Sequence, residues 1–306
     1  LDFSRLFWYN ITMNQIIKSR IEKLSKAYRE LTKSNRNAIK EISAAELPEM
    51  VYNSNAIENS TLTLEDTEDI LIHNMIRTDH EIREIYEAKN LAKAIEYLDN
   101  NPDEPFTAEL ILKLHKILLT DINDDAAGRF RSGDEWVRVG THIGANPDFV
   151  NELIYDLVKD YNNNKESYFI EKIAHFHAEF ENIHPFIDGN GRIGRLLLNR
   201  QLKMEGLPPI IIANKTKTTE YYPLLAKYEK NGTVDDFVDL IAGLVIESLY
   251  RRIAKLTTKK IIPLTDWAKA RELNIQAVSN KALRGTIPAF RINDHWMIDA
   301  AFEEAE

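Results

Sequence analysis

The chain between residues 184 and 195 reads His184-Pro185-Phe186-Ile187-Asp188-Gly189-Asn190-Gly191-Arg192-Ile193-Gly194-Arg195. The residue before a proline disfavours helical geometry, so a helix that arrives from the N-terminal side is expected to end at His184. Gly189 and Gly191 then permit a tight backbone concavity that leads into a second helix. Free N–H groups and the positive end of the helix dipole would lie together there, which predicts an anion site between two helices.

Two arginines follow the glycines. Arg192 and Arg195 are three positions apart, so both are expected on one face of the first turn of the second helix. Two guanidiniums beside an amide nest suit a polyphosphate better than a single carboxylate. Asp188 is the hard oxygen ligand nearest the nest, and His184 has a suitable intrinsic pKa for a base. A His-Pro pair or a Gly-Asn-Gly turn alone is usually structural, but together these parts predict phosphate-group transfer to a hydroxyl.

The same residues match, without a departure, the Fic signature His-x-Phe-x-Asp/Glu-Gly-Asn-Gly-Arg-x-x-Arg, so the chain resembles the Fic family of protein adenylyltransferases. The resemblance implies transfer of AMP from ATP to a Ser, Thr or Tyr hydroxyl of a target protein. His184 would deprotonate the hydroxyl, and Asp188 would hold Mg²⁺ on the phosphates. The nucleotide site would comprise the rest of the signature, namely Gly189, Asn190, Gly191, Arg192, Ile193, Gly194 and Arg195.

Two further stretches fit this resemblance. Residues 128–146 interrupt the helical rhythm with a β-rich run between glycines and are expected to form a short hairpin. Its tip includes the site candidates Val139, Gly140, Thr141 and His142, and in the family such a flap docks the target as an added strand, here at residues 137–143. The pair Tyr221-Tyr222 resembles a pair that lines the nucleotide's base in relatives, although an ordinary aromatic core explains it nearly as well.

An N-terminal stretch resembles the family's inhibitory motif, Ser/Thr-x-x-x-Glu-Gly/Asn. It begins at Ser54 and includes Glu58 followed by Asn59. By this resemblance the chain belongs to the self-inhibited class with an N-terminal inhibitory helix. Glu58 would pair with Arg195 through both carboxylate oxygens and misplace ATP.

Two alternatives to AMP transfer stay open. Some relatives with the inhibitory glutamate remove AMP from the modified protein, with the carboxylate orienting a water molecule. The last fifty residues resemble a winged helix-turn-helix, with two short helices, a turn at Arg284-Gly285 and strands near Phe290–Ile292 and Trp296–Ile298. The second alternative is therefore a nucleotide-sensing regulator whose C-terminal unit binds DNA; a protein-docking role for that unit is as well supported. Self-modification and a homodimer are further expectations.

Apolar spacing predicts a mainly α fold: a Fic-type helical core with a β-hairpin flap and a small winged helix-turn-helix-like unit. We expect helices over residues 14–42, 80–98, 107–120, 148–161, 167–183, 190–205 and 234–257, a break at Pro48, and a helix start at Thr63. The expected regions are 1–105, N-terminal with the inhibitory motif, 106–256, the catalytic core, and 257–306, the C-terminal unit.

Composition sets broad limits on these 306 residues. The chain is 44% hydrophobic and 28% charged, which is typical of a globular protein. It has no cysteine, so disulfides and thiolate zinc sites are excluded, and a reducing cytoplasm fits. The net charge of -9 would repel a polyanion overall, and no apolar run is long enough for a bilayer span, so no membrane partner is expected. The chain begins with Leu1 and has Met13 as a candidate natural start.

Overall fold

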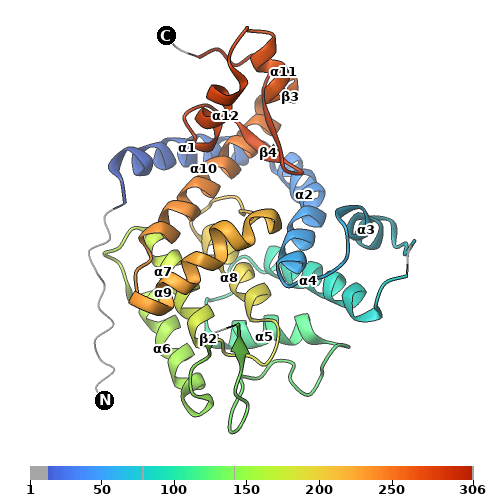
Figure 1. Ribbon diagram of the computed structural model, residues 1–306, viewed down its shortest axis with the longest axis vertical. Helices are drawn as coiled ribbons and strands as arrows, with labels where there is room; N and C mark the ends of the chain where they lie inside the picture. Colours follow the sequence, from blue (N-terminus) through green and yellow to red (C-terminus); the bar gives the residue numbers. More distant parts are fainter. Residues whose placement is uncertain (1–12, 78, 141, 305–306) are drawn as a thin grey trace.

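The computed structural model describes residues 13–77, 79–140 and 142–304, and helices dominate these ranges (Figure 1). The α-helices are α1 (Gln15–Ser34), α2 (Arg36–Ile57), α3 (Leu64–Glu68), α4 (Ile82–Asn100), α5 (Ala108–Leu119), α6 (Val150–Asn163), α7 (Phe169–Ile183), α8 (Asn190–Met204), α9 (Tyr222–Asn231), α10 (Asp235–Thr257), α11 (Leu264–Lys269) and α12 (Ile275–Leu283). Short 3₁₀ or π turns are η1 (Asp69–His73), η2 (Pro147–Phe149), η3 (Asn214–Thr216) and η4 (Lys217–Tyr221).

The described strands form two small antiparallel sheets. Strand β1 (Arg138–Val139) pairs with β2 (His142–Ile143), so the predicted hairpin flap is confirmed. The other sheet has the order β3-β5-β4 and contains β3 (Ile261–Pro263), β4 (Phe290–Ile292) and β5 (His295–Asp299). The mainly helical fold class is thus confirmed.

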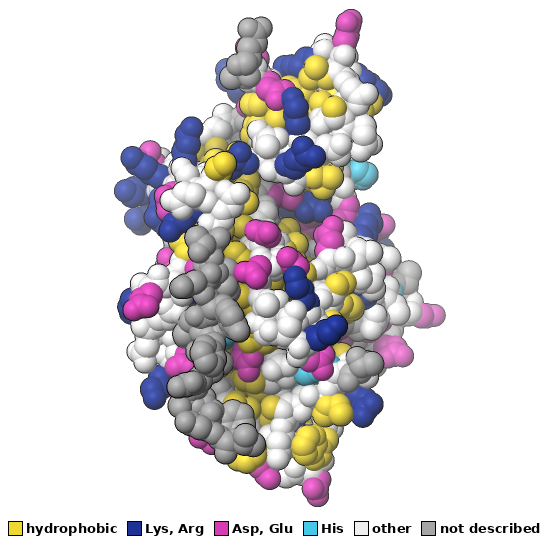
Figure 2. Space-filling view, turned by 60° about the vertical axis from the view of Figure 1, so that its left-hand side comes forward, with side chains coloured by type: hydrophobic (Ala, Val, Ile, Leu, Met, Phe, Trp, Pro, Cys, Tyr) yellow, Lys and Arg dark blue, Asp and Glu magenta, His cyan; other side chains and the backbone are white. Residues whose placement is uncertain are grey.

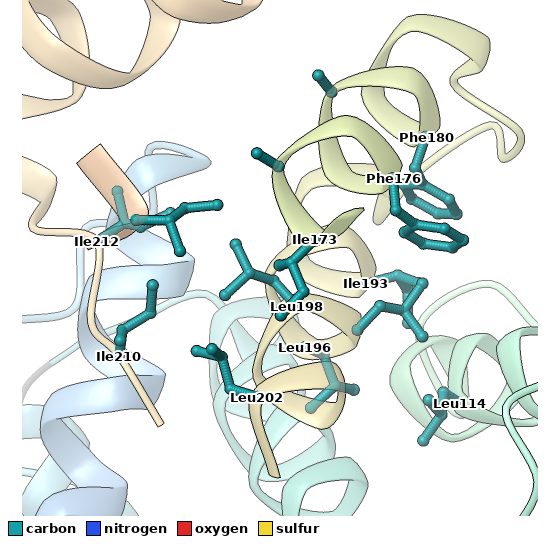
Figure 3. Close-up of a cluster of buried hydrophobic side chains, with 14 of the residues drawn as sticks. Leu114, Ile173, Phe176, Phe180, Ile193, Leu196, Leu198, Leu202, Ile210 and Ile212 are labelled. Atoms are coloured by element: carbon teal, nitrogen blue, oxygen red, sulfur yellow. The ribbon is translucent and has the colours of Figure 1, made fainter. Parts of the chain in front are cut away.

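Helix α8 lies at the centre of the molecule. It packs against α2, α4, α5 and α7, and apolar side chains surround it on several sides (Figure 3). Ile193, Leu197 and Leu202 of α8 are fully buried, and so is Ile173 of α7. Full burial of such a side chain contributes about 1.5–3 kcal/mol, so the helix that carries the arginines of the signature is held rigidly.

The expected break at Pro48 is wrong. Helix α2 runs through Pro48 without interruption, and the chain breaks at Asn35 between α1 and α2 instead. Proline removes one backbone donor, but tertiary contacts on both sides of it offset the loss. Glu46 forms ion pairs with Arg251 and Arg252 of α10, and Glu49 binds Arg251 at 2.5 Å. Helix α2 is therefore fixed along its length by α10.

The expected helix start at Thr63 is confirmed. The Thr63 side chain accepts a hydrogen bond from the Asp66 N–H, and the Asp66 carboxylate accepts one from the Thr63 N–H, at 3.1 and 3.0 Å. This is a capping box, which satisfies two backbone donors at the start of a helix.

None of the helices in the described ranges is long and apolar enough to cross a membrane.

The C-terminal unit lies at one end of the molecule (Figure 1) and has a hydrophobic cluster of its own. Trp267 and Ile298 lie at the centre of that cluster. Polar interactions join the unit to the rest of the chain. Arg291 donates from Nε to Oε1 and from Nη2 to Oε2 of Glu247 in α10, at 2.9 and 2.7 Å, and Arg20 of α1 donates to the Gly285 carbonyl at 2.6 Å. The strand β3 at its start was not predicted, because three residues are too few to show a pattern.

Because the two clusters are separate, deletion of residues 259–306 is expected to leave the remainder folded. Loss of the Arg291–Glu247 pair and of the covered surface should lower the melting temperature by several degrees. Far-ultraviolet circular dichroism of the truncated chain should show helical content and one cooperative transition. A truncated chain that is unfolded or only aggregates would refute the boundary near Thr258.

Candidate functional site

His184 caps the C-terminal end of α7 in a left-handed conformation, with φ of 53°. Its Nδ1 lies 3.2 Å from the Glu181 carbonyl oxygen. Because a carbonyl oxygen only accepts, Nδ1 carries the proton and Nε2 keeps its lone pair. Burial lowers the pKa of His184 to about 4, so the ring is neutral at pH 7. The side chain is therefore in the form that a base requires.

The loop after His184 is locked from within. The Asn190 side chain accepts from the Phe186 N–H and donates to the Phe186 carbonyl, both at 2.8 Å. Phe186 is fully buried and stacks on His115, with ring centroids 3.6 Å apart. His115 Nε2 in turn lies 3.0 Å from the Asp188 carbonyl oxygen. These contacts hold the loop in place and so position the amides at the start of α8, a kind of site that can bind an anion.

The two central glycines have different roles. Gly189 precedes α8 with φ of 84°, as the predicted concavity requires. Gly191 is part of the helix and needs no special backbone conformation, which corrects the expectation for it. A Cβ on Gly191 would lie 2.2 Å from Glu58 Oε1 and 2.8 Å from Arg195 Nη1. Because Gly191 has no side chain, it leaves the space into which the Glu58 carboxylate fits.

Ser54 and Glu58, at the end of α2, both contact Arg195. Arg195 Nη2 donates to Glu58 Oε1 at 2.7 Å and to the Ser54 carbonyl at 2.8 Å, while Nε donates to Ser54 Oγ at 3.0 Å. The carboxylate uses one oxygen where the sequence predicted two, because Ser54 takes the other side of the guanidinium. Burial alone would raise the pKa of Glu58, but the charge of Arg195, its hydrogen bond to Glu58 and the charges of Arg192 and His184 together hold that pKa below its usual value.

Asp188 and Arg192 belong to a second charge cluster. Arg192 Nη2 donates to Asp188 Oδ1 at 2.9 Å, and its Nη1 lies 3.1 Å from Glu87 Oε1. Arg83, at the start of α4, reaches Asp188 Oδ2 and donates to Glu87 at 3.0 Å. Both arginines of the signature are thus paired with acidic side chains.

Tyr221 and Tyr222 do not form a matched pair. Tyr221 is buried, and its hydroxyl lies 2.8 Å from His177 Nε2 in the core. Tyr222 is partly exposed, and its hydroxyl donates to the carbonyl of Ile57 at 2.7 Å. Tyr221 therefore fits the aromatic-core interpretation, and Tyr222 holds the end of α2.

The flap is tied to the loop that begins at His184. Val139 is 55% exposed, Gly140 has φ of 61°, and His142 Nε2 lies 2.9 Å from the Asn182 carbonyl oxygen. Thr141 lies outside the described residues. The buried Arg131 donates to the carbonyls of His184 and Ile183 at 2.7 and 2.9 Å. The flap thus sits beside His184 and presents an apolar surface to solvent.

Several of these residues were not predicted from the sequence: Arg83, Glu87, His115, Arg131, Glu181 and Lys217. Lys217 donates to the carbonyls of Ala56 and Ile57, at 2.8 and 3.1 Å, and so caps the end of α2. Glu181 is buried, which raises its pKa to about 8. No short motif marks these residues, and Arg83, His115, Arg131 and Lys217 each lie far along the chain from a group that they contact.

Buried histidines predict a loss of stability in acid. Burial lowers the pKa of His115 and His184 to about 4 and that of His177 to about 3. Below about pH 6.5 these histidines are protonated in the unfolded chain but stay neutral in the folded chain. The free energy of unfolding therefore falls as pH falls toward 4. Burial raises the pKa of Glu181 and of Glu179, which acts in the opposite direction, but it also lowers the pKa of a fourth histidine, His175, to about 4.

Thermal melts at about pH 7.5 and about pH 5 should therefore differ by several degrees, with the lower melting temperature in acid. An equal or higher melting temperature at the lower pH would contradict these pKa directions.

Comparison with known proteins identifies the domain that carries the site. Residues 105–202 match the Fic/DOC family. The chain is 33% identical to protein adenylyltransferase fic-1 of Caenorhabditis elegans over 215 residues, which cover 68% of this chain and 41% of that protein. It is 32% identical to protein adenylyltransferase Fic of Drosophila persimilis, over 65% of this chain and 39% of that one. The chain therefore spans less than half the length of these relatives.

Solved structures agree on the fold. A Fic domain containing signaling protein from Bacteroides thetaiotaomicron superposes with a TM-score of 0.69 at 26% identity, over 78% of this chain and 96% of that one. Fic-1 from C. elegans gives a TM-score of 0.63 at 28% identity, over 78% and 73%. A Fic family protein from Desulfovibrio desulfuricans, at 22% identity, shares the fold over 98% of this chain with a TM-score of 0.67. The chain therefore carries a Fic domain, and residues 105–202 are the part that matches the Fic/DOC family.

Proposed function

We propose that this chain transfers AMP from ATP to a Ser, Thr or Tyr hydroxyl of a target protein. The observation that carries the proposal is the arrangement of a neutral His184, with its Nε2 lone pair available, beside the free amides at the start of α8. A base and an anion site joined by one rigid loop suit attack of a hydroxyl on a phosphate. The curated relatives described above carry the name protein adenylyltransferase.

In the proposed step, His184 Nε2 accepts the proton of the target hydroxyl. The hydroxyl oxygen forms a bond to the α-phosphorus of ATP. The bond from that phosphorus to the oxygen bridging to the β-phosphate breaks, and pyrophosphate leaves with the electron pair. The amides at the start of α8 stabilise the negative charge on the phosphates, and so does Arg192 in its present position, together with Arg195 once Glu58 has released it.

Asp188 fits the role of a magnesium ligand. It is one carboxylate, 31% exposed, next to the anion site, and the described residues contain no cluster of three or more His, Asp or Glu side chains that could hold a metal ion. Mg²⁺ is commonly bound by one or two carboxylates together with substrate phosphates, so a single carboxylate suits it. Bound Mg²⁺ would neutralise charge on the phosphates.

We propose that Glu58 inhibits this reaction within the same chain. Its carboxylate occupies Arg195 and the space above Gly191, where a phosphate would otherwise bind. Lys217 and Tyr222 hold the end of α2 in this position. The charged state of Glu58 also supports a second candidate function, removal of AMP with Glu58 orienting a water molecule.

The flap supports the proposed docking of a target at residues 137–143. Val139 and Ile143 are both about half exposed, and a two-stranded hairpin leaves an edge free to pair with another strand. Docking of the target is thus proposed as strand addition. Self-modification and a homodimer stay predictions.

The C-terminal unit is a weaker candidate for DNA binding. Lys281 is paired with Glu304 and Arg291 with Glu247, and basic and acidic side chains are interspersed over this end of the molecule (Figure 2). A DNA-binding face usually shows a basic stripe. We favour a protein-docking role and retain the proposed regions 1–105, 106–256 and 257–306.

Transfer of label from ATP tests the proposed function. The full chain is incubated with Mg²⁺ and ATP labelled at the α-phosphate or, separately, at the γ-phosphate. AMP transfer predicts protein-bound label from the first and none from the second. Label from the γ-phosphate alone would indicate a kinase-like reaction and refute the proposal, whereas release of AMP from a modified protein would favour the second candidate.

A further inference from the structure

The carboxylate proposed to bind Mg²⁺ has both oxygens occupied by arginines. Asp188 Oδ1 accepts from Arg192 Nη2 at 2.9 Å, and Oδ2 accepts from Arg83 Nη2. Arg192 is part of the family signature, whereas Arg83 comes from the start of α4, 105 positions earlier in the chain. Arg83 therefore has no role in the proposed chemistry as described so far.

The two arginines differ in freedom. The Arg192 side chain is only 3% exposed and is also held by Glu87 at 3.1 Å. The Arg83 side chain is 51% exposed, and among the described residues its other ion pair joins Nε to Glu87 at 3.0 Å. An exposed ion pair contributes only about 0.2–1 kcal/mol, so Arg83 can leave Asp188 at little cost, whereas Arg192 cannot.

A divalent cation and a guanidinium cannot share the same lone pair. Mg²⁺ coordinates carboxylate oxygens at about 2.0–2.1 Å, well inside the distance of a hydrogen-bonded nitrogen. Each carboxylate oxygen has a second lone pair, but Arg83 is the partner that can move, so Oδ2 is the oxygen for which a cation would compete most readily. A guanidinium left in place would also repel the arriving positive charge.

We infer that Arg83 is a positioning residue that holds the Asp188 carboxylate in the metal-free protein and competes with the divalent cation for Oδ2. Glu87 keeps Arg83 beside the site after the exchange and holds Arg192 still. The strength of the Arg83–Asp188 pair then sets the affinity of the site for metal. The inference rests on the proposed function for the assignment of Asp188 as the metal ligand.

Manganese titration of the full chain without nucleotide tests this competition. Free Mn²⁺ is followed by electron paramagnetic resonance for the wild type, Arg83→Gln, Arg83→Lys and Asp188→Asn. Asp188→Asn defines binding elsewhere on the protein. Removal of a competing exposed pair is expected to lower the dissociation constant in Arg83→Gln by about 1.5- to fivefold. Arg83→Lys keeps the charge but loses the planar guanidinium group. Its dissociation constant for Mn²⁺ should lie between those of Arg83→Gln and the wild type.

Arg77→Gln is the matched control. Arg77 is 53% exposed and is paired with a carboxylate, that of Asp69, so its substitution makes the same change of charge at the same exposure. Equal affinity in wild type and Arg83→Gln, weaker binding in Arg83→Gln, or an equal gain in Arg77→Gln would overturn the inference. Binding no stronger than that of Asp188→Asn in both wild type and Arg83→Gln would also overturn it. Because no nucleotide is present, the titration does not depend on AMP transfer. A failure of the proposed AMP transfer can therefore be distinguished from a failure of this inference.

Discussion

Glu58→Gly is expected to raise AMP transfer from ATP by about a hundredfold, because a substrate displaced by about 1 Å can lose that much rate. The substitution removes the carboxylate that lies 2.7 Å from Arg195 Nη2 and empties the space above Gly191. Arg195 then becomes available to the phosphates. The measurement is incorporation of label from α-labelled ATP into the protein itself, together with the affinity for Mg-ATP, which should also increase.

A control variant is needed to separate two effects of Glu58→Gly, the release of Arg195 and the destabilisation of α2 by glycine. Glu41→Gly places the same substitution in α2, at an exposed glutamate, and should leave transfer unchanged. Glu58→Gly with unchanged transfer and unchanged ATP affinity would contradict the inhibitory assignment. A similar increase in Glu41→Gly would mean that destabilising α2 is enough, and that Glu58 has no special role.

Local patterns in the sequence predicted much of the fold. The apolar spacing located α4 to α8 and α10 to within a few residues, because each of these helices buries one face in a shared core. Thr63 and Asp66 predicted a helix start because capping is decided within one turn. Pro48 gave the wrong break, because ion pairs between α2 and α10 outweigh the local preference of proline. A contact with residues some two hundred positions away leaves no local pattern.

The residues of the candidate site also differ in whether a local pattern in the sequence reveals them. His184 and Asp188 could be proposed from the sequence because they lie within one contiguous stretch of twelve residues. Arg131, His115 and Arg83 fix that stretch from other segments, and only the folded chain brings them to it. Tyr221 and Tyr222 show that neighbours in sequence need not serve the same site. Tyr221 contacts the buried His177, whereas Tyr222 contacts the end of α2.

His184→Ala in the Glu58→Gly background is expected to reduce transfer by about 10²- to 10⁴-fold, the usual contribution of a positioned base. The wild-type ring offers Nε2 as an acceptor because Nδ1–H is directed at the Glu181 carbonyl and burial keeps the ring neutral, and alanine has no such group. Affinity for ATP should change little, since the groups proposed to bind the phosphates are the amides of α8, Arg192 and Arg195. Label incorporation and calorimetric titration with ATP measure the two effects separately.

The ratio of the two effects decides what His184 does. A large loss of transfer with ATP binding retained assigns it to proton transfer, because a residue that only shaped the loop would weaken nucleotide binding as well. His73→Ala, at an exposed histidine in η1, is the matched control and should leave both quantities unchanged. Retained transfer in His184→Ala would exclude His184 as the base. Equal losses of transfer and of ATP affinity would instead make it a structural cap of α7, whose left-handed backbone at the end of the helix is then its main contribution.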